Sequence, residues 1–94
     1  HEMMRIALAQ GVTLGGRHVL RFLGAADGQA NLGLTDLLAP ASGRQRFFSG
    51  RPGEPLALIP GAFVRITELG RSRVKLALDT RVKVERVGPS TDQT

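Results

Sequence analysis

The sequence has no cysteine, no tryptophan and no tyrosine, and it has only two histidines among its 94 residues. The absence of cysteine excludes disulfides, thiolate nucleophiles and cysteine-based zinc sites. Away from the chain start, His18 is the single imidazole, and one imidazole rarely makes a metal site. We therefore expect no metal ion and no other cofactor.

Long apolar runs are also missing. No run approaches the ~18 residues that a membrane-spanning helix needs. Residues 3–11 lack the basic and apolar regions of a secretory signal. These absences predict a cytoplasmic protein with no membrane insertion, or a periplasmic one if an upstream segment has been removed.

Groups suited to catalysis are few and scattered. Asp27, Asp36 and Asp79 fall at expected turns, where a carboxylate commonly accepts backbone N–H groups. His18 has no nucleophile constellation around it. The glycine-rich segment 11–16 lacks the lysine and the following helix of a phosphate-binding loop. We expect that the protein is not an enzyme.

Basic charge is the first positive feature of the chain. The net charge is +5, the isoelectric point is near 11.4, and eleven of the thirteen basic residues are arginine. Residues 44–86 hold ten basic and four acidic groups, whereas the first 43 residues hold three of each. Arginine favours phosphate and carboxylate partners, although a charge of this size is also ordinary for a soluble domain.

The second positive feature is a two-residue alternation of apolar and polar side chains, which is typical of β strands. Glycine and proline pairs such as Gly15-Gly16 and Pro60-Gly61 punctuate it and indicate tight turns. The stretch 17–23 is apolar on both faces, as in a central strand. The expected strands cover residues 4–9, 12–14, 17–23, 29–34, 44–49, 55–59, 62–69, 73–79 and 81–87.

The order of strands and turns repeats along the chain. Aligning residues 18–36 with residues 64–80 matches Leu23-Gly24 to Leu69-Gly70 and Leu32 to Leu76. We expect one all-β domain over residues 1–94, a small β-sandwich or barrel of two similar antiparallel halves with three to four strands each. The first β repeat is 4–36, the connector 37–43, the second β repeat 44–87 and the disordered tail 88–94. The alternative is that two unrelated hairpins look alike.

The second half resembles the CsrA/RsmA carbon-storage regulators, which are small bacterial RNA-binding proteins. The matching features are Phe47-Phe48-Ser49 followed by Gly53-Glu54, a Leu69-Gly70 hairpin with Arg73-Val74-Lys75-Leu76 after it, and Val82-Lys83-Val84-Glu85-Arg86 at the end. The first half carries the hairpin again, from Leu23-Gly24 to Leu32-Gly33-Leu34.

The resemblance implies binding of GGA-containing single-stranded RNA loops and regulation of translation, with Arg86 as the chief contact. It also implies that two halves of one chain mimic the strand-exchanged dimer of that family. From the residues themselves, Arg73, Lys75 and Lys83 are expected to project from adjacent strands as a basic sheet face suited to phosphates. The full set of candidate RNA-binding residues is Arg86, Lys83, Arg81, Arg73, Lys75 and Arg51.

Two further readings stay open. The basic groups are also compatible with a sheet edge protected from aggregation, since exposed aromatics are scarce. A non-catalytic assembly module, similar to the small periplasmic homology domain of type II secretion and pilus assembly proteins, would bind protein partners by strand-edge pairing. Phe47 and Phe48 are then the partner contacts, and one of the two must face away from the core, whereas Phe22 and Phe63 are expected in it. Either a monomer or a homodimer is compatible with a core this small.

Overall fold

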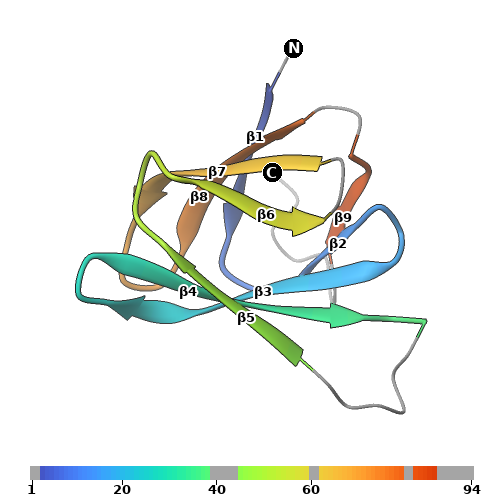
Figure 1. Cartoon of the computed structure of the whole chain (residues 1–94), viewed down its shortest axis with the longest axis horizontal. Helices are drawn as coiled ribbons and strands as arrows, with labels where there is room; N and C mark the ends of the chain where they lie inside the picture. Colours follow the sequence, from blue (N-terminus) through green and yellow to red (C-terminus); the bar gives the residue numbers. More distant parts are fainter. Residues whose placement is uncertain (1–2, 39–44, 60–61, 80–81, 87–94) are drawn as a thin grey trace.

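A computed structural model describes residues 3–38, 45–59, 62–79 and 82–86 of the chain. These residues form strands joined by turns, with no helix among them. The strands, shown in Figure 1, are β1 (Met3–Leu8), β2 (Val12–Leu14), β3 (His18–Ala26), β4 (Gln29–Asp36), β5 (Gln45–Gly50), β6 (Pro55–Ile59), β7 (Ala62–Leu69), β8 (Val74–Asp79) and β9 (Val84–Arg86). In that part of the chain no helix is therefore long and apolar enough to cross a membrane.

The strands make two antiparallel sheets that pack face to face. The four-stranded sheet has the order β1-β8-β7-β6 and the five-stranded sheet the order β5-β4-β3-β2-β9. Figure 1 shows the first sheet above the second, with the β5–β6 connection passing from one layer to the other. The two sheets do not close into a barrel. The prediction of an all-β fold is confirmed, with a sandwich and not a barrel as its form, and β3 is a central strand as expected.

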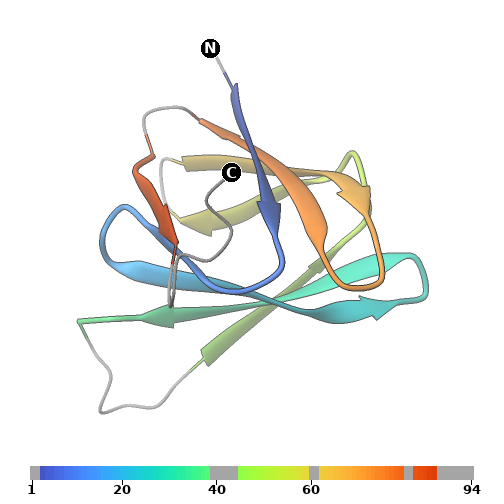
Figure 2. The same cartoon turned by 180° about the vertical axis from the view of Figure 1, so that it is seen from behind.

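Each sheet contains strands from both halves of the sequence. The division into two repeats would instead place each half in a sheet of its own. β1 pairs with β8 of the second half, as Figure 2 shows, whereas β5 pairs with β4 and β9 pairs with β2 of the first half. Replacing β1, β8, β7 and β6 by the strands four places away in the chain gives β5, β4, β3 and β2, which is the order of the other sheet. The molecule therefore has an approximate internal twofold relation with its first strands exchanged.

The pairing register repeats as well. The matched pairs are Phe22 with Leu32 and Ile66 with Leu76, and each is followed by a register shift on the first strand of its hairpin. A bulge of this kind bends the strand and increases its twist. Finding it at the same place in both hairpins supports a duplicated β unit.

This register corrects the alignment of the two hairpins. Leu23, at the first bulge, corresponds to Thr67 at the second rather than to Leu69, so the alignment of the two Leu-Gly pairs was wrong by two positions. The hairpins are equal in length between the matched pairs. They differ in their turns: Asp27 and Gly28 both have positive φ, 56° and 77°, as in the two-residue turn that suits the twist of paired strands.

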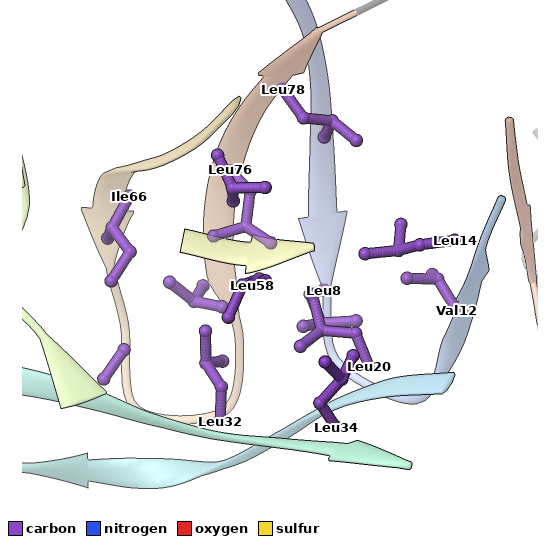
Figure 3. Packing of buried hydrophobic residues seen from close by; sticks show 13 residues of the cluster. Leu8, Val12, Leu14, Leu20, Leu32, Leu34, Leu58, Ile66, Leu76 and Leu78 are labelled. Atoms are coloured by element: carbon purple, nitrogen blue, oxygen red, sulfur yellow. The ribbon is translucent and has the colours of Figure 1, made fainter. Parts of the chain in front are cut away.

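The core lies between the two sheets and consists mainly of leucine. Figure 3 shows Leu20, Leu32 and Leu34 of the five-stranded sheet pointing toward Leu8, Leu58 and Leu76 of the other sheet. Full burial of each such side chain stabilises the fold by about 1.5–3 kcal/mol. The fully buried large side chains are Leu8, Val12, Leu14, Leu20, Leu32, Leu34, Leu58, Val64, Ile66, Val74, Leu76 and Leu78.

Three local expectations were wrong. Phe63 is exposed on β7 with the guanidinium of Arg65 5.3 Å from its ring centre, so it is not a core residue. Alternation along residues 73–79 predicts that Asp79 lies on the exposed face of its strand, but Asp79 is buried. Residues 35–38 could form one helical turn by their sequence, but Thr35 and Asp36 extend β4, because their backbone continues to pair with β3. The predicted connector 37–43, from residue 39 onward, and the whole of the predicted tail 88–94 lie outside the described residues.

Candidate nucleic-acid interface

The predicted basic face is divided between the two sheets. Lys75 is on β8, whose neighbours are β1 and β7, whereas Lys83 directly precedes β9, whose neighbour is β2. The expectation that Arg73, Lys75 and Lys83 project from adjacent strands was therefore wrong. The physical reason is that β8 and β9 follow each other in the sequence but join different sheets, so their side chains cannot share one face.

In the four-stranded sheet, Arg73 and Lys75 lie at the β7–β8 turn. With Glu68, Leu69 and Gly70 they line a small open depression. The ammonium of Lys75 is 3.5 Å from a carboxylate oxygen of Glu68, and both side chains are exposed. Such a pair is weak and screened by salt, so the ammonium of Lys75 stays available to an external anion beside the guanidinium of Arg73.

In the five-stranded sheet, Lys83 lies directly before β9 and Arg86 at its end. Lys83 accepts a backbone hydrogen bond from Gly15 through its carbonyl oxygen at 2.7 Å, and its ammonium is 3.9 Å from Glu85. Arg86 lies opposite Val12 in the β2–β9 pairing. Its side chain and the whole of Arg81 are outside the part of the chain that the structure describes. The structure therefore places the backbone of the chief candidate at a sheet edge.

Arg51 lies at a third place, the tip of the β3–β4 hairpin. A Cβ added at Gly28 would meet Nη1 of Arg51 at 2.7 Å, so the guanidinium rests over that glycine. The backbone N–H of Arg51 donates to Oε1 of Glu54 at 2.8 Å, which fixes the start of the β5–β6 turn. The guanidinium itself makes no ion pair with any residue that the structure describes.

The structure distinguishes the two adjacent phenylalanines. Phe48 lies opposite Leu32 and packs against the core, with the guanidinium of Arg46 5.7 Å from its ring centre. Phe47 lies opposite Gly33 and is 70% exposed. Phe47 is therefore the exposed phenylalanine of this pair, and it lies on β5, an edge strand to which a partner could pair.

The residue that sequence reasoning missed is Arg21. It is exposed on β3 and lies opposite Gly33, which in turn lies opposite Phe47. Residues directly opposite each other in antiparallel strands project to the same face. Alternation within residues 17–23 could have placed Arg21 on the outer face, but its nearness to Phe47 depends on two registers between strands that no local pattern encodes.

At the other end of the β3–β4 pair, Arg17 and Asp36 form a two-pronged ion pair. The Nε atom of Arg17 donates to Oδ1 at 3.2 Å and Nη2 donates to Oδ2 at 3.1 Å. The hydrogen bonds from Arg17, and then the backbone N–H of Leu38, hold the pKa of Asp36 below its usual range. The same pairing raises the pKa of Arg17, which is already very high. This pair closes the end of the hairpin and leaves Arg17 less able to bind an external anion.

Among the described residues, no group of three or more histidine, aspartate or glutamate side chains is placed to hold a metal ion. Comparison of the chain with models of protein families, with curated proteins and with solved structures gave no match.

Proposed function

We propose that the protein binds single-stranded RNA and acts as a non-catalytic post-transcriptional regulator of the kind that the CsrA/RsmA resemblance implies. The observation that carries the proposal is the exchange of β1 and β5 between the two repeats. The resemblance implies that one chain mimics a strand-exchanged dimer. Pairing of the first strand of each repeat with a strand of the other repeat supports this implication.

The distribution of charge supports the same proposal. Arg21, Arg51 and Arg73 are exposed and make no ion pair within the described part of the chain. Unpaired guanidinium groups are suited to phosphate oxygens, which they can bind through two hydrogen bonds. Their binding energy would decrease as salt increases, because phosphate contacts release counterions.

The test is a titration of a fluorescent RNA hairpin with GGA in its loop, and of an unrelated hairpin, at two salt concentrations. We expect tighter binding of the GGA loop and loss of that preference in Arg86→Ala. Arg71→Ala, which changes an exposed arginine outside the candidate set, is the matched control and should keep the preference. Salt-sensitive binding of both RNAs with equal affinity would contradict a regulator that reads sequence.

A second candidate function is a protein-interaction module. The observation in its favour is that β5 is an edge strand and carries Phe47 with most of its ring exposed. A partner strand could pair with β5 and cover this ring. Concentration-dependent self-association, or co-elution with a strand-forming peptide that Phe47→Ala abolishes while neither RNA binds, would favour this candidate.

A further inference from the structure

We infer that the outer face of the five-stranded sheet holds a nucleobase subsite made by Phe47, Gln45 and Arg21 around Gly33. This inference rests on the proposed binding of single-stranded RNA and assigns a base contact to it. The subsite is separate from β9 and from the β7–β8 turn, where most of the basic candidates lie.

The three side chains share one face for reasons of register. Arg21, Gly33 and Phe47 lie in one row across β3, β4 and β5. Gln45 is two residues before Phe47 on β5 and so projects to the same side. With strands about 4.8 Å apart, the backbones at Arg21 and Phe47 are separated by about 10 Å.

Gly33 lets the Gln45 side chain lie directly over the backbone in the middle of this row. Its own backbone is buried, and a Cβ added to it would overlap the amide of Gln45, whose Cδ would be 2.8 Å away, and would come within 3.2 Å of Cδ1 of Leu23. The Gln45 amide and a Leu23 methyl thus rest where a larger residue at position 33 would project. Any other side chain at that position would displace the amide.

The chemistry of the row fits a base better than a phosphate alone. Phe47 presents an exposed ring, and base stacking on an aromatic side chain is tolerant of sequence. A glutamine amide both donates and accepts hydrogen bonds, as base edges require. Arg21 supplies a positive charge for the adjoining phosphate.

The surrounding positions do not oppose a polyanion. The outward residues of β3, β4 and β5 next to the row are uncharged: Leu23, Asn31, Thr35 and Ser49. Ser49 donates to the side-chain oxygen of Asn31 at 2.7 Å, so part of this polar border is already fixed. The charge of Arg21 therefore acts without a neighbouring carboxylate in the row.

The test uses the full chain and three oligonucleotide probes: a nine-nucleotide unstructured RNA, the same RNA with 2-aminopurine at its centre, and the same backbone without bases. We expect the base-free backbone to bind more weakly than the RNA. Phe47→Ala should weaken RNA binding by about 5- to 150-fold, the range for loss of one stacked base, and should leave the salt dependence unchanged. It should also abolish quenching of 2-aminopurine.

Two variants separate the other parts of the subsite. Gly33→Ala should displace the Gln45 amide and reduce discrimination between bases more than it reduces affinity. Arg21→Ala should lower the salt slope by about 0.7, the value for one phosphate contact on a single strand. Phe63→Ala is the matched control, because Phe63 is an exposed phenylalanine with a neighbouring arginine on the other sheet, and it should bind as the unchanged chain does.

The outcomes distinguish this inference from the proposed function. If the unchanged protein binds neither the GGA hairpin nor any of the three probes, RNA binding itself is wrong and the subsite with it; if it binds the GGA hairpin and none of the three probes, only the subsite is wrong. If the protein binds RNA and the base-free backbone equally well, or if Phe47→Ala and Phe63→Ala behave alike, the subsite is wrong while RNA binding stands. If Phe47→Ala changes only the molar mass in light scattering, Phe47 serves protein association and the subsite is again wrong.

Discussion

Arg17 and Asp36 join the start of β3 to the end of β4 through paired hydrogen bonds from one guanidinium to one carboxylate. The pKa of Asp36 is lowered by this contact, below the value of about 3.9 for an unfolded chain. A carboxyl group with a lowered folded-state pKa stabilises the fold above its unfolded pKa, and this contribution is lost as the pH falls through the folded-state pKa. The ion pair should therefore stabilise the protein at neutral pH and not in acid.

The first prediction is that Asp36→Asn melts at a lower temperature than the unchanged protein at pH 7, and that the difference shrinks as the pH falls below the ordinary carboxyl pKa of about 3.9 and through the lowered pKa of Asp36. The asparagine oxygen can still accept the N–H of Leu38, which Asp36 accepts at 2.9 Å, so the variant removes mainly the charge. The shift should be no more than roughly a few degrees, because the pair is exposed. Thermal melting followed by circular dichroism at pH 7 and at a series of acidic pH values measures it. Asp27→Asn, at an exposed turn position where asparagine tolerates the positive φ, is the control, and an equal pH-dependent shift there would contradict the prediction.

The second prediction concerns Leu32 and Leu76, which occupy matched positions in the two hairpins and are both fully buried. Replacing either by alanine removes apolar contacts and leaves a cavity between the sheets, which costs about 2–5 kcal/mol. Because the internal twofold relation gives them equivalent surroundings, we expect the two losses to agree within about 1 kcal/mol, well inside that range. Urea unfolding of Leu32→Ala and Leu76→Ala measures both. A large loss for one and almost none for the other would mean that the two halves of the core are not equivalent.

The strands could be predicted from the sequence because their signals are local. Alternation and the glycine or proline turns located β2, β6 and β7 with the bounds that the structure has, and most other strands within a few residues. The alternation of apolar and polar residues also indicates which face of a strand is buried. It does not identify the neighbouring strand, since many apolar strands can cover the same core.

For that reason the candidate site was predicted only in part. Lys75 and Lys83 are close in the sequence and in similar alternating patterns, yet β8 and β9 belong to different sheets. Phe47 and Phe48 were equivalent until the register with β4 placed Phe48 opposite Leu32. The row containing Arg21 depends on the same register, so it became visible only in three dimensions.

The third prediction follows from the exchanged strands. Neither residues 1–43 nor residues 44–94 hold a complete sheet, because β1, β5 and β9 each pair with the other half. We expect neither half alone to unfold cooperatively as a monomer, and an equimolar mixture of the two to form a one-to-one complex that does. Light scattering on a size-exclusion column and thermal melting provide the measurements. A monomeric half with its own sharp transition would show that the exchange is not needed for folding.

The fourth prediction concerns the tip of the β3–β4 hairpin. Gly28 has a φ of +77°, a conformation that costs a residue with a Cβ about 1–2 kcal/mol. Gly28→Ala should lower the free energy of unfolding by that amount, and its methyl group should also displace the Arg51 guanidinium, 2.7 Å from the added carbon. Gly33→Ala is the matched control, because it adds the same methyl group on the same strand pair at a residue without positive φ, against the flexible end of Gln45. The backbone origin of the effect can be isolated by repeating Gly28→Ala in an Arg51→Ala background, where the loss of stability should persist. If it vanished there, the contact with Arg51 rather than the turn conformation would be its cause.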